Sequence, residues 1–308
     1  MNRVIAYLKT LQHYRQQVGW PETVGLLGAV LSVKTGNAAS PQARKQLERW
    51  VFFQKLACNE KMTAVQFSLD ECRVTYAARP AAERPVTLTL RIPSSVSSDS
   101  LVFEQIFLRG EYQHVLDWFA SVKPAGAVAR ILDVGANIGC AALFFHTQVP
   151  AAEMFCLEPE PGNQARLTAN LALNPGAKIK THSAAIWTAS GRLRCVHDFR
   201  EGQEWAARFV ELNDADQADS VAAVDIWQLA KLADFSQVDL LKMDVEGAEA
   251  VLLHDGEFKR FLTEKVSMVA MEIHPEFISF PESVAILESL GYQTRIVDEF
   301  VCGVNRNR

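Results

Sequence analysis

The sequence predicts an α/β fold: a mostly parallel sheet with a closing antiparallel hairpin, preceded by a helical region and a small β extension. From Ile131 onward, short apolar runs alternate with amphipathic segments, as strands alternate with helices in a parallel sheet. The first of these runs passes into its helix through a glycine-rich turn. Two alternating runs, Tyr292–Val297 and Phe300–Asn305, flank Asp298-Glu299 and predict the hairpin.

The N-terminal part of the chain is expected to be helical. The segments Val4–Val18 and Glu22–Val33 are separated by a Gly19-Trp20-Pro21 break. A third helix is expected at Pro41–Ala57, because Ser40 can cap its first turn and proline suits the first helical position.

Alternating residues then predict a small β extension with strands at 64–69, 73–77 and 86–92. The polar stretch 93–100 (PSSVSSDS) separates this extension from the remainder of the chain. We therefore predict two domains, 1–94 with no assigned role and 95–308 with the sheet.

The second domain is predicted to begin with one or two helices at 101–122 that pack before the sheet. Its expected strands are 131–134, 154–157, 178–183, 220–224, 238–243 and 266–273, and its expected helices are 140–149, 162–173, 225–232, 249–255 and 281–290. Residues 191–209 are irregular and predict a pair of strands that leads into a loop.

Composition describes an ordinary globular protein and excludes some partners. The chain has 308 residues, 49% of them hydrophobic, and a net charge of −5, so no overall field attracts nucleic acid. The ten-residue apolar run Val24–Val33 is too short to span a bilayer, and no signal peptide is evident. The six cysteines are scattered without a C-x-x-C pair, which indicates free thiols and a cytoplasmic location.

The glycine-rich turn carries the first candidate site. Asp133, Gly135, Asn137 and Gly139 form the pattern D-x-G-x-N-x-G, which differs from the G-x-G-x-x-G of dinucleotide sites. A loop that opens with a carboxylate suits a ligand with a cationic end, such as S-adenosyl-L-methionine (SAM). Asp133 is expected to meet the ammonium group of SAM directly or through water.

Glu158 supports a nucleoside ligand, because it follows the next apolar strand and can accept hydrogen bonds from both ribose hydroxyls. That contact fits NAD equally well, so only the glycine loop separates the two cofactors. A nicotinamide-dependent oxidoreductase therefore stays open as an alternative, as does a turn with capping acids that binds no ligand.

A second group of polar residues follows two later strands. Asp244 and Glu246 come after 238–243, and Glu272 and His274 close 266–273. Ligands of open α/β sheets bind beyond the carboxyl ends of the strands, so these residues should converge with Asp133 and Glu158. Plainer interpretations are charge compensation at a helix start for Glu246 and Glu249, and a structural histidine. Divalent metal binding is the less favoured alternative, because the spacing matches no known ligand motif.

Tyr112 and Glu111 follow Gly110 within the helical segment before the sheet. Core packing is the plain interpretation for most of that segment. We nevertheless predict that Tyr112, together with Glu246 and Glu272, contacts the substrate.

The combined motifs resemble the FkbM-type SAM-dependent methyltransferases. The resemblance rests on DVGANIG at 133–139, LEP at 157–159, and above all DLLKMDVEGAE at 239–249. EIHP at 272–275 and VFEQIFLRGEY at 102–112 are also similar to that family. The resemblance runs from about Asp99 to the C-terminus, whereas residues 1–94 resemble no family.

This resemblance implies a class I, Rossmann-like methyltransferase sheet, SAM as the donor, and a hydroxyl acceptor on a sugar, glycan or secondary metabolite. By position, the loop at 133–139 would cradle the methionine part, Glu158 would hold the ribose, and Asp244 would lie near the reactive methyl. Ser183 and Ala184 would lie beside the adenine, although the sequence there lacks the polar residues often found after that strand.

The implied reaction is direct displacement at the sulfonium methyl, in which alignment of the acceptor contributes most. Asp244 or His274 would accept the hydroxyl proton, and no metal is expected. A non-catalytic subunit with this fold is a further alternative. The expected partner is a small molecule or glycan, without nucleic acid or a transmembrane segment, and a homo-oligomer is left open.

Overall fold

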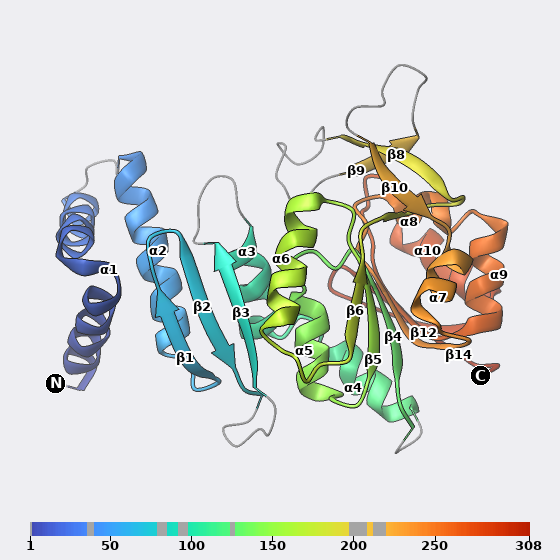
Figure 1. The fold of residues 1–308 in the computed structure, drawn as a ribbon, viewed down its shortest axis with the longest axis horizontal. Helices are drawn as coiled ribbons and strands as arrows, with labels where there is room; N and C mark the ends of the chain where they lie inside the picture. The colour runs from blue at the N-terminus through green and yellow to red at the C-terminus, as the bar shows by residue number, and fades with distance from the viewer. Residues whose placement is uncertain are drawn as a thin grey trace. The chain divides into compact units, whose positions relative to one another are not determined.

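The structure is a computed structural model that describes residues 2–35, 40–78, 85–91, 98–123, 127–196, 208–211 and 220–308. It divides into two compact units, Met1–Arg109 and Gly110–Arg308 (Figure 1). The first unit includes residues 98–109, which the sequence grouped with the sheet. The two domains expected at 1–94 and 95–308 stay a prediction. The separate role of residues 1–94 remains a prediction.

The first unit begins with the predicted helices. Helix α1 (Asn2–Lys34) has one non-helical residue, Gly19, with φ of 83°. The two expected helices therefore meet at a kink at Gly19, which confirms the predicted break. Helix α2 (Pro41–Ala57) has the predicted bounds, and the Ser40 hydroxyl accepts a hydrogen bond from the Ala43 amide at 3.2 Å. Buried aromatic side chains pack α1 against α2 and the following strand; they include Tyr14, Trp50, Phe53 and Phe67.

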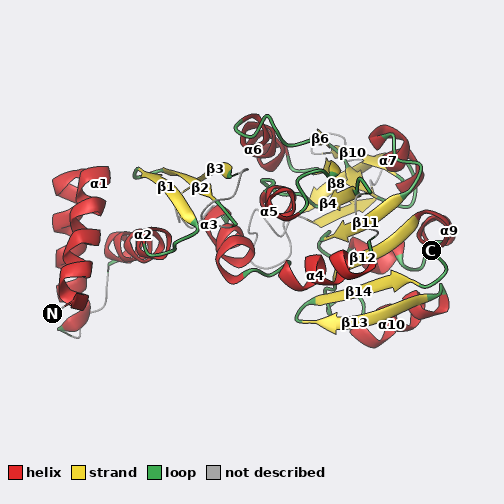
Figure 2. Ribbon diagram, turned by 90° about the horizontal axis from the view of Figure 1, so that it is seen from below, coloured by secondary structure: helices red, strands yellow, loops and turns green. Residues whose placement is uncertain are grey.

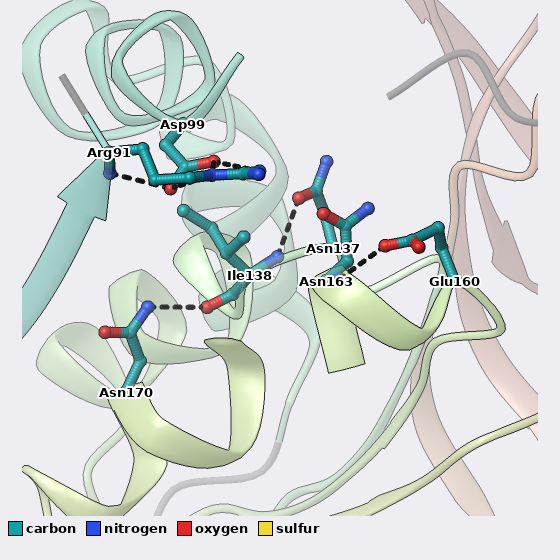
Figure 3. A network of polar contacts seen from close by, with 7 residues as sticks. All are labelled: Arg91, Asp99, Asn137, Ile138, Glu160, Asn163 and Asn170. Atoms are coloured by element: carbon teal, nitrogen blue, oxygen red, sulfur yellow. Dashed lines mark hydrogen bonds and ion pairs between the residues drawn. The ribbon is translucent and has the colours of Figure 1, made fainter. Parts of the chain in front are cut away.

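The first unit also contains a three-stranded antiparallel sheet in the order β1-β2-β3. Its strands are β1 (Met62–Phe67), β2 (Glu71–Tyr76) and β3 (Val86–Arg91). Helix α3 (Asp99–Phe103) then continues into the π-helix η1 (Glu104–Arg109). The buried Asp99 carboxylate pairs with the Arg91 guanidinium at 2.9 Å and ties α3 to β3 (Figure 3). Much of the polar stretch 93–100 lies outside the described residues.

The second unit contains a seven-stranded sheet in the order β13-β14-β12-β11-β4-β5-β6. Strands β12, β11, β4, β5 and β6 are parallel, whereas β14 runs antiparallel to both β12 and β13, so the predicted closing hairpin is confirmed. The strands are β4 (Arg130–Val134), β5 (Glu153–Leu157), β6 (Ile179–His182), β11 (Val238–Met243), β12 (Val266–Glu272), β13 (Tyr292–Val297) and β14 (Phe300–Asn305).

Helices cover both faces of this sheet. Figures 1 and 2 show α4, α5 and α6 on one side and α7, α9 and α10 on the other. The helices are α4 (Gln113–Val122), α5 (Cys140–Gln148), α6 (Pro161–Ala172), α7 (Ile226–Ala233), α8 (Ala248–Leu252), α9 (Gly256–Lys265) and α10 (Phe280–Ser289). Helix α9 was not predicted, although Asp255 is a helix-capping residue type and its carboxylate accepts from the Phe258 amide at 2.8 Å.

A separate small sheet has the order β7-β10-β8-β9. Its strands are β7 (Ala185–Ile186), β8 (Gly191–Val196), β9 (Arg208–Glu211) and β10 (Ser220–Val224). The strand expected at 220–224 therefore belongs to this sheet rather than the large one, and β7 was not predicted. Among the described residues, no helix is both long and apolar enough to cross a membrane.

Candidate functional site

Strand register brings the predicted polar residues to one edge of the large sheet. Strand β11 lies between β4 and β12, and all three are parallel. Lys242 on β11 is paired with Asp133 on β4, and Met243 is paired with Met271 on β12. Asp244 and Glu272 therefore each follow a paired residue, and their side chains extend from neighbouring strand ends.

Gly135 is required by the close approach of the loop to β11. Its φ is 77°, and a Cβ at this position would lie 1.7 Å from the Asp244 carbonyl oxygen. The Asp244 amide also donates a hydrogen bond to the Val134 carbonyl oxygen at 3.0 Å. The glycine thus lets the glycine-rich loop and the residue after β11 touch, because no side chain fits between them.

The rest of the loop is held by its own polar groups. Asn137 has φ of 50°, and its side-chain oxygen accepts from the Ile138 amide at 2.8 Å. The Asn170 side chain on α6 donates to the Ile138 carbonyl oxygen at 3.0 Å (Figure 3). Gly139 has φ of 89°, and a Cβ there would lie 2.7 Å from the Leu167 side chain, so this glycine lets α6 pack on the loop.

Glu158 follows β5 and links the loop to the neighbouring strand. Its side chain is buried, with one carboxylate oxygen accepting from the Asn137 amide at 2.7 Å and the other from the Glu160 amide at 2.9 Å. Burial raises the pKa of Glu158 to about 7 against the opposing effect of these two amides. Each carboxylate oxygen has a second lone pair, so the predicted ribose contact is compatible with this geometry.

Asp133 is wholly buried and faces a cation supplied by the protein. The Lys242 ammonium lies 3.0 Å from the Asp133 carboxylate and donates to the Gly135 carbonyl oxygen at 2.7 Å. Burial alone would lower the pKa of Lys242, but the carboxylates of Asp133 and Asp244 raise it, so the lysine stays charged. The direct contact predicted between Asp133 and the SAM ammonium therefore competes with Lys242.

Lys242 is the site residue that the sequence analysis missed. Its ammonium is also 4.0 Å from the Asp244 carboxylate and 5.9 Å from the centre of the Tyr112 ring. The available signal was a lysine inside the apolar run of a strand expected to be buried on both faces. A buried lysine is rare unless it is paired, and its partner was not evident without the strand register.

A histidine and several carboxylates lie beyond β11 and β12. His274 is fully buried; its Nδ1 is 2.9 Å from a Glu249 oxygen, and its Nε2 is 3.2 Å from Glu246 and 3.9 Å from Glu272. Glu249 also accepts from the backbone amides of Gly247 and His274. Burial would lower the pKa of His274, but its bonds to Glu246 and Glu249 raise it to about 11.

Asp244 is the most accessible member of this group, with 31% of its side chain exposed against 15% for Glu272. Burial, followed by the charge of Asp244, raises the pKa of Glu272 to about 9 and that of Glu111 to about 7. A histidine that keeps its proton cannot accept another at neutral pH. The raised pKa of His274 and the greater exposure of Asp244 therefore favour Asp244 over His274 as the group that meets an acceptor hydroxyl.

The remaining predicted residues differ in how far they face outward. Tyr112 is 2% exposed and packs edge-on against Phe145 and Phe300, so it forms a buried wall of the site. Ser183, just after β6, is exposed, whereas the Ala184 side chain belongs to the hydrophobic core. The adenine and substrate contacts predicted for these residues stay predictions.

Sequence comparison relates the chain to one family. A profile of the family described as "Methyltransferase FkbM domain" matches residues 133–294, just over half of the chain. Methyltransferase sdnD of Sordaria araneosa is 28% identical over 191 residues, which cover 53% of this chain and 73% of sdnD. The 2-O-methyltransferase NoeI of Sinorhizobium fredii is 28% identical over 147 residues, which cover 41% of this chain and 57% of NoeI.

Solved structures show more distant similarity. Methyltransferase FkbM from Methylobacillus flagellatus KT aligns with a TM-score of 0.41 at 14% identity, over 67% of this chain and 53% of that protein. The family match instead rests on sequence, and its segment includes the glycine loop, Glu158, Asp244 and His274. The chain therefore belongs to the FkbM methyltransferase family and is a methyltransferase that uses SAM.

Proposed function

We propose that the chain transfers the methyl group of SAM to a hydroxyl of a sugar, glycan or similarly hydroxylated metabolite. One observation carries this proposal: Asp244, the most exposed acid of the site, follows β11 directly beside the glycine loop. A carboxylate in that position can hold a hydroxyl against a cofactor seated on the loop. The name of NoeI, a 2-O-methyltransferase, supports the same acceptor chemistry.

For the cofactor, we propose that Gly135, Asn137 and Gly139 receive the methionine part of SAM and that Glu158 accepts from the ribose hydroxyls. The buried pair of Asp133 and Lys242 supports the loop from below, because Lys242 binds the Gly135 carbonyl oxygen. Ser183 and the backbone of Ala184 would lie beside the adenine. Family membership decides against the nicotinamide-dependent alternative.

For the acceptor, we propose that Asp244 orients the hydroxyl and favours loss of its proton, with Glu246, Glu272 and the Tyr112 wall shaping the rest of the pocket. Without a bound ion, His274 keeps its proton between Glu246 and Glu249 and so acts by position and charge. Alignment of the acceptor oxygen, the methyl carbon and the sulfur in one line can supply about 7–11 kcal/mol of the rate enhancement.

Residues 1–94 contain none of the motifs that resemble the family, so we propose that they contribute to acceptor choice. A chain without them should still bind SAM and lose its preference among acceptors; a folded shortened chain that fails to bind SAM would contradict this. The expected cytoplasmic location stays a proposal. It is supported by five cysteines that form no disulfide among the residues described, Cys58, Cys72, Cys140, Cys156 and Cys302.

Transfer of labelled methyl from SAM to a panel of sugars, glycans and hydroxylated metabolites tests the function. Asp244→Asn should lower kcat by about 10²–10⁴-fold while SAM affinity changes little, because the charge beside the acceptor is lost. Asp234→Asn is the matched control, since Asp234 is exposed after α7 and its φ of 59° is tolerated by asparagine. Label appearing only on amines, or normal kcat in Asp244→Asn, would refute the proposal.

A further inference from the structure

We propose that Asp244, Glu272 and His274 bind one divalent cation at the carboxyl ends of β11 and β12. Each of the three offers one ligand atom, and these atoms lie within 4.8 Å of one another. Two ligands that share Mg²⁺ at about 2.0–2.1 Å can be at most about 4.2 Å apart. His274 Nε2 and a Glu272 oxygen, 3.9 Å apart, already meet that limit, and the Asp244 oxygen lies within 4.8 Å of both.

The sheet positions these three ligands. Asp244 follows β11, while Glu272 and His274 come from the end of β12, and these strands are paired in parallel with Met243 opposite Met271. The exposed fraction of the side chain rises from 1% for His274 through 15% for Glu272 to 31% for Asp244. Such a gradient provides a buried anchor and an open side where acceptor oxygens can complete the coordination.

The orientation of His274 is a second, independent observation. Glu249, which is not one of the three ligands, holds the Nδ1 side of the ring at 2.9 Å and is itself fixed by the Gly247 amide at 2.9 Å. Nε2 then faces the acids, 3.2 Å from Glu246 and 3.9 Å from Glu272. Metal-bound histidines almost always have a carboxylate or carbonyl on the other ring nitrogen in this way.

Charge and donor type indicate which ion fits. Four carboxylates lie near one imidazole, namely those of Asp244, Glu246, Glu249 and Glu272. The nearby Lys242 ammonium is shared between Asp244 and the closer Asp133, so it offsets little of this negative charge. A divalent ion would take the place of the histidine proton and offset the remaining negative charge. A set dominated by carboxylate oxygens suits Mg²⁺ or Mn²⁺ better than a soft metal.

The consequence for the reaction rests on the proposed function. A bound cation would hold the acceptor hydroxyl and lower its pKa, so that the proton leaves to solvent. The acceptor oxygen then forms its bond to the methyl carbon as the carbon–sulfur bond breaks, which leaves S-adenosylhomocysteine. Asp244 would orient the hydroxyl through the ion. The sequence favoured a metal-free site over a metal site at Asp244, Glu246, Glu272 and His274. It could not show that ligand atoms of three of these, all except Glu246, lie within 4.8 Å of one another.

Direct binding of Mn²⁺ to the full chain tests the inference without an acceptor. Protein stripped with EDTA and dialysed is titrated with Mn²⁺ and followed by electron paramagnetic resonance, with Mg²⁺ as competitor. We expect one ion per chain, bound at least about tenfold more weakly in Asp244→Asn and Glu272→Gln. Glu264→Gln, an exposed acid on α9, should bind like the wild type. Absence of binding, or equal binding in both cluster variants, would overturn the inference.

Circular dichroism and SAM binding on the same samples show that the variants are folded, which is expected because Asp244 and Glu272 are partly exposed. The two proposals fail separately. Methyl transfer to a hydroxyl that continues unchanged in EDTA overturns the cation site and leaves the proposed function standing. Specific Mn²⁺ binding with no transfer to any hydroxylated acceptor supports the cation site and refutes the proposed function.

Discussion

The two halves of the proposed site, the side proposed to hold the cofactor and the side proposed to meet the acceptor, treat their carboxylates differently. On the cofactor side, Asp133 faces Lys242, and Glu158 accepts from two backbone amides, so each acid already has a partner within the protein. On the acceptor side, Glu246, Glu249 and Glu272 lie around a single histidine, and Asp244 is partly exposed. The first half is a preorganised cradle, whereas the second has an excess of negative charge.

This contrast shows how one strand can serve both halves. Lys242 faces the cofactor loop, and Asp244, two residues further along the chain, follows the end of β11 on the acceptor side. Both lie beside the point where the loop after β4 approaches the Asp244 backbone, which Gly135 permits. Substitutions in the loop and on β11 should therefore change stability, SAM binding and catalysis to different extents.

Lys242→Met should have the largest effect on stability. It leaves the wholly buried Asp133 carboxylate without its cation, which costs about 3–5 kcal/mol in comparable buried pairs. Urea denaturation measures the free energy of unfolding, and the double variant Lys242→Met with Asp133→Asn should recover part of the loss. If Lys242→Met alone is as stable as the wild type, the pair does not support the cradle.

Gly135→Ala should come next, because its Cβ would overlap the Asp244 carbonyl oxygen and φ is 77°. Overpacking and a strained backbone together predict a loss of about 2–4 kcal/mol and much weaker SAM binding. Gly176→Ala is the control, since a Cβ there meets no atom within 4 Å. Equal melting temperatures for the two variants would show that the loop can move away from β11.

Glu158→Gln should weaken SAM binding by about 1–3 kcal/mol, because the charged acceptor for the ribose is lost. Glutamine keeps one acceptor oxygen for the loop amides, so the free energy of unfolding should fall less than in Glu158→Ala. Calorimetry with SAM measures the affinity. Wild-type SAM affinity in Glu158→Gln would exclude the ribose contact. The role of Glu158 would then be limited to its hydrogen bonds with the Asn137 and Glu160 amides.

The smallest effect concerns pH. The pKa of Glu158 is raised by burial from its ordinary 4.5 to about 7 in the folded chain. Ribose hydroxyls donate to the charged form, so SAM binding should release a proton near neutral pH and become weaker as the pH falls below about 7. Because the pKa is higher in the folded chain than in the unfolded chain, Glu158 lowers the free energy of unfolding above about pH 7. This loss disappears as the pH falls below the ordinary pKa of 4.5. Calorimetry in buffers of different ionisation heat should detect the proton in the wild type but not in Glu158→Gln.

Local patterns were sufficient for most of the fold. Helix α2, strand β11 and the two strands of the closing hairpin have their predicted bounds, because apolar periodicity and capping residues act over a few neighbouring positions. The D-x-G-x-N-x-G spacing likewise identified the loop. The length of α3 and η1 and the separate small sheet required the structure, because they depend on packing and pairing between separate segments. Helix α9 was missed although it has a local signal, the capping residue Asp255.

The sequence by itself determined the order along the chain of the seven strands of the large sheet and of most helices, the glycine loop and the identity of the acids at or just after the ends of β4, β5, β11 and β12. Only the tertiary structure decided their partners: Lys242 for Asp133, backbone amides for Glu158, and His274 for Glu246 and Glu249. The reason is that pairing and burial depend on which strands lie side by side and in what register. That register joins residues more than a hundred positions apart, as Lys242 and Asp133 are, and no local pattern specifies it.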